Sequence, residues 1–286
     1  MSSFDEQLEH LVKEALAEDV GDGDHSTLSV IPPQQQGKAV LKVKQAGVLA
    51  GVAVAEKIFL YKDPGAVFLA FKADGDPMMP GQHAFEVTAS VHTILTCERL
   101  VLNCIQRMSG IATLTRRYTE KLRGYHTKLL DTRKTTPNFR LLEKEAVRIG
   151  GGVNHRFGLY DMIMLKDNHI DYCGGLEPAI NKAYQYTQQL KQPLKIEVET
   201  RSIEDVRKVC EVGQGKVFRI MLDNFSPAMI KEALLLIKSD FETEASGGIN
   251  LETIESYAAT GVDYVSVGGL IHQAQSLDLS LKAVLL

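Results

Sequence analysis

The stretch KLLDTRKTTPNFRLLEKEAVRIGGGVNHRFGLYDMIMLKDNHI (128–170) decides the fold of this chain. It contains two short apolar runs, 128–130 and 162–165, and each is followed by polar and cationic residues instead of continuing as an amphipathic helix. Runs of this kind indicate buried parallel strands, so the cations stand where strands end. In α/β barrels the carboxyl ends of the strands carry the active site. The stretch therefore predicts two βα-type units at the rim of a barrel.

Cationic side chains gather in this stretch although the chain as a whole carries a formal net charge of −4. A single Arg or Lys is usually a solvated surface charge, and that reading stays open for each residue taken alone. Cations that flank two buried strands beside a run of three glycines (150–152) instead favour a pocket for a small anionic ligand. The residues concerned are Arg133, Lys134, His155, Arg156 and Lys166.

Length and composition limit the classes of protein that this chain can represent. Its 286 residues suffice for one large barrel with a small additional domain. A pI near 6.1 provides no overall basic field for nucleic acid or for an anionic membrane surface. The first twenty residues show neither a secretory signal nor a mitochondrial presequence, and four cysteines without a CxxC pair suggest free thiols. We expect a cytoplasmic protein with no membrane segment.

The first part of the chain predicts a small α+β domain over residues 1–110. A helical apolar period covers 5–18, and strands are expected at 38–44, 67–72 and 84–89. Helices are expected at 52–61 and from residue 93 to about 123, the second with a kink at Ser109-Gly110.

From residue 111 to 286 the pattern changes to an alternation of strand, loop and helix. This alternation predicts a parallel sheet and a second domain, an open, incomplete α/β barrel of about six strands. We expect the last helix to pack back on the first domain. A doubly wound open sheet is the structural alternative. The predicted strands begin near Lys128, Met162, Leu194, Phe218, Phe241 and Tyr264.

The last two predicted strands end in glycine pairs, and the middle two end in acids. Glycine lets backbone N–H groups approach a phosphate, and in barrels the phosphate site often follows the last two strands. The glycine loops are Ser246-Gly247-Gly248 and Gly268-Gly269. Glu197 and Glu199 share one face of a strand, and Asp223 ends the next strand. Such carboxylates suit Mg²⁺ bound together with a polyphosphate, although they could simply neutralise neighbouring cations.

Taken in order, these motifs make the chain similar to the quinolinate phosphoribosyltransferases, also called nicotinate-nucleotide pyrophosphorylases (carboxylating), a type II phosphoribosyltransferase family. The resemblance runs through nearly the whole chain. It is carried by Glu98-Arg99, Ser109 to Thr113, Asp131 to Thr135, Gly150 to Arg156, Leu165 to His169, Glu197 to Glu199, Leu222 to Asn224 and both glycine pairs.

The resemblance implies an N-terminal α/β sandwich domain, an open barrel and a homodimer with shared active sites, while larger assemblies such as a hexamer stay open. It implies transfer of phosphoribosyl from phosphoribosyl pyrophosphate to quinolinate with decarboxylation, giving nicotinate mononucleotide, CO₂ and pyrophosphate, with Mg²⁺. Arg99 matches the arginine that one subunit contributes to its neighbour's site. The quinolinate pocket matches Arg133, His155, Arg156 and Lys166, with Thr132 beside them.

In the same resemblance Lys134 reaches toward phosphate, while Glu199 and Asp223 match the acids near the ribose and the metal. Ser246, Gly247, Gly248, Gly268 and Gly269 match the loops that bind the 5-phosphate. The catalytic set implied is Lys134, Lys166, Glu199 and Asp223. Two alternatives remain: a paralogue acting on another anionic aromatic acid, and a non-catalytic sensor of a pyridine nucleotide or phosphosugar.

Overall fold

The computed structural model describes residues 3–284, except the side chain of Ser239, and divides into two compact units. The first contains the chain up to Arg116, Thr135–Gly151 and the chain from Leu270 onward. The second contains Arg117–Lys134 and Gly152–Gly269. No helix in the described part of the chain combines the length and the apolar character that crossing a membrane requires.

The first unit is built on a four-stranded antiparallel sheet with the order β12-β1-β5-β3. Its strands are β1 (Gln36–Val43), β3 (Val67–Ala70), β5 (His83–Ser90) and β12 (Leu279–Val284). Strand β5 alternates buried and half-buried residues from Phe85 to Ser90, as expected for a sheet with one covered face, whereas β1 has three consecutive buried residues from Ala39 to Leu41. The aromatic ring of Phe59 meets that of Phe85 edge-on at 6.4 Å between centroids, so helix and sheet share an aromatic core.

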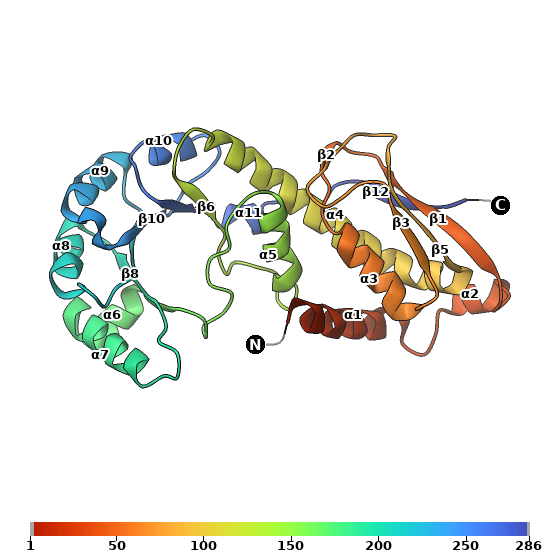
Figure 1. Ribbon diagram of the computed structural model, residues 1–286, viewed down its shortest axis with the longest axis horizontal. Coiled ribbons are helices and arrows are strands. Elements are labelled where there is room, and N and C mark those ends of the chain that lie inside the picture. Colours follow the sequence, from red (N-terminus) through yellow and green to blue (C-terminus); the bar gives the residue numbers. More distant parts are fainter. Residues whose placement is uncertain (1–2, 285–286) are drawn as a thin grey trace. The chain divides into compact units, whose positions relative to one another are not determined.

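The helices of this unit are α1 (Phe4–Val20), α2 (His25–Val30), α3 (Val52–Lys62), most of α4 (Val91–Lys121) and α5 (Arg140–Ile149). Figure 1 shows α3 and α4 running along the antiparallel sheet. Helix α4 is one continuous helix through Ser109-Gly110. A Cβ at Gly110 would lie 2.1 Å from the carbonyl oxygen of Gln275, so glycine here permits close backbone packing. A two-stranded ribbon, β2 (Gly47–Val48) with β4 (Pro77–Met78), completes the unit.

The second unit is a six-stranded parallel sheet with the order β6-β11-β10-β9-β8-β7. The strands are β6 (Lys128–Leu130), β7 (Ile163–Leu165), β8 (Ile196–Thr200), β9 (Arg219–Asp223), β10 (Glu242–Ser246) and β11 (Tyr264–Ser266). Their helices are α6 (Asp167–Cys173), α7 (Leu176–Gln188), α8 (Ile203–Val212), α9 (Pro227–Leu236) and α10 (Ile254–Ala258). The short α11 (Gly269–His272) begins at the last residue of this unit, and its other residues belong to the first unit. In Figure 1 helices α7 to α10 follow one another in an arc outside the strands.

This barrel is open because β6 and β7, the first two strands in sequence, form the two ends of the sheet and are not paired with each other. The helix between them in sequence, α5, belongs to the first unit. A short segment at Val153 takes the free edge of β6 instead: its N–H donates to the carbonyl of Leu129 at 2.8 Å. The open six-stranded barrel predicted from the alternating pattern is confirmed.

The end of the chain adds a strand that the sequence analysis did not predict. Strand β12 belongs to the first unit and pairs with β1 in antiparallel register from Lys38↔Val284 to Val43↔Leu279. Leu279 and Leu281 are buried and alternate with Ser280 and Lys282, a period of two that is typical of a strand.

Candidate active site

The ends of four neighbouring strands bring one cation, two acids and a serine to the same rim of the open barrel. Lys166 follows β7 directly, Glu199 lies near the end of β8, and Asp223 and Ser246 end β9 and β10. Asp223 and Ser246 are direct partners in the parallel register. Because parallel strands end on one side, the strand ends that the sequence separates by 80 residues meet here.

An ion pair joins two of the side chains at this rim. Lys166 Nζ donates to Glu199 Oε2 at 3.1 Å, and the Glu199 side chain is only 8% exposed. Burial raises the pKa of Asp223, and the nearby charge of Glu199 raises it further. A carboxyl group whose ionisation is disfavoured by a neighbouring carboxylate forms a place where a cationic ligand or a divalent metal ion would be stabilised.

The loop after β10 is shaped by Gly247, whose φ is +96°. A Cβ at this position would lie 2.2 Å from Oδ1 of Asn224, the residue after Asp223. Asn224 itself adopts a φ of 58°, its N–H donates to the carbonyl of Ser246 at 2.8 Å, and its Nδ2 donates to Asp223 Oδ2 at 2.6 Å. Glycine at 247 is therefore required to keep the loops after β9 and β10 in contact. Gly248 has a φ of +65° with open space around it.

The second glycine pair lies after β11, where Gly268 is in a turn and Gly269 begins α11. Both glycines are half-buried. With the loop after β10 they occupy the ends of two adjacent strands, because β10 pairs with β11 in the sheet.

The loop after β6 supplies the predicted cations of the first βα unit. Thr132 accepts a hydrogen bond from the Lys134 N–H at 3.1 Å, and Lys134 is exposed. Arg133 is half-buried, and its Nε is buried with no hydrogen-bond partner among residues 3–284. A buried guanidinium N–H without an acceptor is costly in a folded protein. It therefore marks a position where an anionic ligand would complete the structure.

Arg156 belongs to the same group of cations. Burial lowers its pKa, and the positive charge of Arg133 lowers it further. Its guanidinium donates from Nη1 to the carbonyl of Met162 at 3.1 Å, which holds the side chain against the strand that precedes Lys166. Arg133 and Arg156 thus repel each other electrostatically unless a negative charge is shared between them.

His155 is buried, and both of its ring nitrogens lie close to protein groups. Its Nδ1 accepts the N–H of Arg156 at 2.7 Å. Its Nε2 lies 3.0 Å from Glu197 Oε2 and 3.3 Å from Glu244 Oε2, and both glutamates are fully buried. The place of His155 in the quinolinate pocket, which the resemblance implies, stays a prediction.

The side chains of His155, Glu197 and Glu244 influence one another's pKa. Burial alone would lower the pKa of His155, but Glu197 and Glu244 raise it to about 9. Burial and Glu244 raise the pKa of Glu197 to about 6, while His155 and Arg219 outweigh burial and lower that of Glu244.

Asp131 fixes the backbone that carries these residues. Its Oδ1 accepts the N–H of His155 at 2.8 Å, and its Oδ2 accepts a bond from Asn154 Nδ2 at 3.2 Å. Asp131 is itself fully buried at the end of β6. The loop with Arg133 and the segment with Arg156 are therefore joined through one carboxylate.

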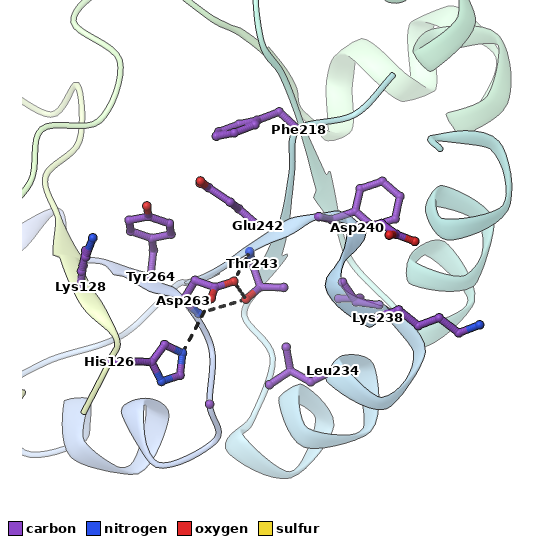
Figure 2. A pocket seen from close by; sticks show the side chains of 13 residues that line it. His126, Lys128, Phe218, Leu234, Lys238, Asp240, Glu242, Thr243, Asp263 and Tyr264 are labelled. Atoms are coloured by element: carbon purple, nitrogen blue, oxygen red, sulfur yellow. Dashed lines mark hydrogen bonds and ion pairs between the residues drawn. The ribbon is translucent and has the colours of Figure 1, made fainter. Parts of the chain in front are cut away.

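Two hollows lie near the starts of the strands, at the opposite ends from Lys166, Glu199 and Asp223. The larger, about 710 Å³, is shown in Figure 2, where Lys128, Tyr264 and Glu242 extend from the starts of β6, β11 and β10. Its polar groups are largely paired with one another; Asp263, for example, accepts from the Thr243 N–H at 2.9 Å. The smaller hollow, about 290 Å³, reaches His155 and Arg156.

Arg99 is exposed on α4 in the first unit, whereas the other predicted site residues all lie in the second. Sequence analysis gave no role to Asp131, Arg219 or Glu244, although charged residues inside otherwise apolar strands were a usable signal. Arg219 Nη1 lies 2.9 Å from Glu244 Oε2, so the strand charges neutralise one another in the barrel interior.

Comparison with known proteins agrees with this fold. Residues 24–109 match the N-terminal domain and residues 111–282 the C-terminal domain of quinolinate phosphoribosyl transferase. The chain is 43% identical over 288 aligned residues to quinolinate phosphoribosyltransferase [decarboxylating] 1b of Nicotiana tabacum, covering 96% of this chain and 82% of that protein. It is 41% identical to the probable nicotinate-nucleotide pyrophosphorylase [carboxylating] of Bacillus subtilis, covering 98% and 94%.

Among solved structures, NadC from Streptococcus pyogenes superimposes with a TM-score of 0.92 at 42% identity, covering 100% of this chain and 99% of that one. The nicotinate-nucleotide pyrophosphorylase from Francisella tularensis gives 0.88 at 34% identity, covering 99% and 98%. Two matching domain models, full-length relatives and the same open barrel agree with one another. The chain belongs to the quinolinate phosphoribosyltransferase family.

Proposed function

We propose that this protein transfers the phosphoribosyl group of phosphoribosyl pyrophosphate to quinolinate and releases CO₂, producing nicotinate mononucleotide in NAD biosynthesis. The observation that carries the proposal is that Arg133 is near enough to Arg156 to lower the pKa of Arg156, while the buried Nε of Arg133 has no hydrogen-bond partner among the described residues. Two neighbouring guanidinium groups of this kind suit a ligand with two adjacent carboxylates. An arginine fork can bind both oxygens of a carboxylate at once.

The quinolinate pocket in this proposal is formed by Arg133, His155, Arg156 and Lys166, with Thr132 at its edge. The Nδ1 of His155 accepts the Arg156 N–H at 2.7 Å, which links these two residues. Arg99 completes the pocket from a second copy of the chain, in a homodimer. Its exposed side chain on α4 is compatible with a role across an interface.

Phosphoribosyl pyrophosphate occupies the rim on the other side of Lys166. The loops with Ser246, Gly247 and Gly248 and with Gly268 and Gly269 bind its 5-phosphate through backbone N–H groups. Lys134, exposed and with a mobile ammonium group, binds the pyrophosphate.

Glu199 and Asp223 stabilise the positive charge that develops on C1 of the ribose as the bond to pyrophosphate breaks and the ring nitrogen of quinolinate attacks. Fixed carboxylates need no reorganisation at that moment, and their effect is strong in a partly buried site. The same two carboxylates, crowded enough to raise the pKa of Asp223, fit a divalent cation bound through substrate and water. Mg²⁺ there would neutralise charge on the leaving pyrophosphate.

Decarboxylation follows from the product of the transfer. The positive charge of the pyridinium nitrogen stabilises the electron pair that stays on C2 when the 2-carboxylate departs as CO₂, and a proton then adds to C2. Lys166 is placed to orient the reacting carboxylate, because its ammonium group is held by Glu199 at 3.1 Å beside the rim. We further propose that the reaction takes place in the cytoplasm.

The test is incubation of the purified protein with quinolinate, phosphoribosyl pyrophosphate and Mg²⁺, with nicotinate mononucleotide measured by mass spectrometry and nicotinate as the control substrate. We expect product from quinolinate alone, lost without Mg²⁺. Product only from another aromatic acid would move the assignment to a paralogous transferase. Binding of phosphoribosyl pyrophosphate without turnover of any acid would leave a sensor.

A further inference from the structure

We infer that Asp161 is a positioning residue for quinolinate: it closes the loop of residues 157–161 and thereby sets where Arg156 directs its guanidinium group. The inference rests on the proposed function, and it assigns a role to an acid that the sequence analysis did not single out. Both carboxylate oxygens of Asp161 accept hydrogen bonds from the backbone, so its effect on quinolinate is exerted through Arg156.

Two hydrogen bonds to one side chain close the loop. Asp161 Oδ2 accepts the N–H of Phe157 at 2.6 Å, and Oδ1 accepts the N–H of Gly158 at 2.9 Å. Hydrogen bonds to an ionised carboxylate are roughly twice as strong as those between neutral groups. Gly158 is buried, and a Cβ there would lie 2.4 Å from Cε1 of Tyr160, so the tyrosine ring lies close over this glycine. The five residues are therefore held in one compact loop.

Arg156 is held at both ends of this loop. Phe157 follows Arg156 directly in the chain, and its N–H is bound to Asp161. Met162 follows Asp161, and its carbonyl accepts a hydrogen bond from Arg156 Nη1 at 3.1 Å. Nη2 of the same guanidinium lies 3.6 Å from the sulfur of Met164 in β7. The closed loop therefore brings the Met162 carbonyl to the arginine six residues earlier and fixes that side chain against the sheet.

The charges around Arg156 support the same role. Burial lowers the pKa of Arg156, and the positive charge of Arg133 lowers it further. The negative charges of Glu197 and Asp161 act in the opposite direction and raise this pKa. Of these two acids, Asp161 is the one in the loop that follows Arg156 in the chain. Its charge therefore offsets part of the repulsion between the two guanidinium groups.

Asp74 provides a matched control, because it makes the same kind of contact in the first unit. Its Oδ1 accepts two successive N–H groups at the start of α3, those of Gly51 at 2.6 Å and Val52 at 2.8 Å. Asp74 and Asp161 are both half-buried. Removal of either carboxylate leaves two backbone N–H groups without this acceptor, so a merely structural role predicts similar effects of the two removals. A positioning role predicts that only the loss of Asp161 affects quinolinate.

The first experiment measures steady-state kinetics and urea denaturation of Asp161→Ala and Asp74→Ala beside the wild type. We expect Asp161→Ala to raise KM for quinolinate about 10-fold to 100-fold, the range that follows from a displacement of a binding group by about 1 Å. Its KM for phosphoribosyl pyrophosphate should change less than about threefold, and Asp74→Ala should leave both KM values within about twofold. Equal effects of the two substitutions on quinolinate, or an unchanged quinolinate KM in Asp161→Ala, would overturn the inference.

A second experiment needs no altered acid and so holds even if those variants fold poorly. Amide hydrogen exchange of the wild type, labelled with ¹⁵N-phenylalanine, is followed by NMR, and the Phe157→Tyr spectrum identifies the Phe157 signal. We expect the Phe157 N–H to be protected from exchange before any ligand is added, because Asp161 already accepts it. Rapid exchange of this N–H in the free protein would refute a loop that Asp161 holds closed.

The two proposals fail separately. Calorimetry with phthalate, which carries two adjacent carboxylates but no ring nitrogen, measures binding without turnover. Asp161→Ala should raise the Kd of phthalate by about the same 10-fold to 100-fold. A wild type that binds phthalate but forms no nicotinate mononucleotide refutes the proposed function, whereas the change in Kd still decides the positioning role. An active wild type whose Kd for phthalate is unchanged in Asp161→Ala refutes the positioning role alone.

Discussion

Replacing Gly247 by alanine should damage both the stability of the barrel and its phosphate site. Gly247 has a φ of +96°, which costs an L-residue about 1–3 kcal/mol. The new Cβ would lie 2.2 Å from Asn224 Oδ1 and 3.0 Å from the Asn224 backbone nitrogen. Asn224 must therefore move, and its hydrogen bond to Asp223, worth about 1 kcal/mol at this exposed position, is lost. The sum is a loss of about 2–4 kcal/mol in the free energy of unfolding.

Gly248→Ala is the matched control. Its φ of +65° lies in the left-handed region, but nothing lies within 4 Å of the added Cβ. It should cost about 1 kcal/mol, the backbone strain alone. Comparing the two variants separates the clash with Asn224 from the cost of any side chain in this loop.

The assays are equilibrium urea denaturation and KM for phosphoribosyl pyrophosphate. Gly247→Ala should raise that KM more than about tenfold, because Asp223 loses its partner and the loop shifts away from the phosphate. Gly248→Ala should raise it by no more than a few-fold. Equal stability of the two variants would show that a Cβ at position 247 does not clash with Asn224 between the loops after β9 and β10.

Three further outcomes are expected. Arg99→Ala should abolish activity while the dimer stays intact. Mixing this variant with the Arg133→Ala variant should restore part of the activity once subunit exchange is verified. No restoration would contradict a site shared between two subunits. Glu143→Gln should cost about 3 kcal/mol in urea denaturation, because the fully buried carboxylate holds Arg107 at 2.9 Å, whereas Glu145→Gln should cost under about 1 kcal/mol. Burial raises the pKa of the Cys97 and Cys104 thiols to about 12, so alkylation of the folded protein at pH 8 should spare both cysteines. Mass spectrometry of the alkylated protein measures this, and rapid labelling of either cysteine would refute its burial.

Much of the barrel could be read from local patterns. The predicted strand starts at Lys128 and Tyr264 agree with the observed strands, and those near Met162, Leu194 and Phe241 fall within two residues of them. Buried parallel strands are short and apolar, they alternate with amphipathic helices, and each ends in polar residues, so the signal is repeated six times. The expectation that Lys166, Glu199 and Asp223 meet followed from the same rule, because parallel strands end on one side.

Contacts that depend on which strands are neighbours could not be read in this way. The sheet order places β11 beside β6, and Val153 on the free edge of β6, through pairs far apart in sequence. The return of β12 to β1 joins residues separated by more than 230 positions, as in Lys38↔Val284. The periodicity of residues within one segment does not identify the strand that pairs with it, because the hydrogen bonds of the pair also depend on the distant partner strand.

By itself, the sequence determined the alternation of strands and helices, the cations and acids at strand ends, and the glycines that keep loops open to a phosphate. Tertiary structure alone decided the state of His155. Its ring nitrogens face Arg156 on one side and two buried glutamates on the other, and one of these, Glu244, lies 89 residues away in the chain. The residue type of a side chain sets which donors and acceptors it can bind. The groups that lie beside it in the folded barrel determine which of these it does bind.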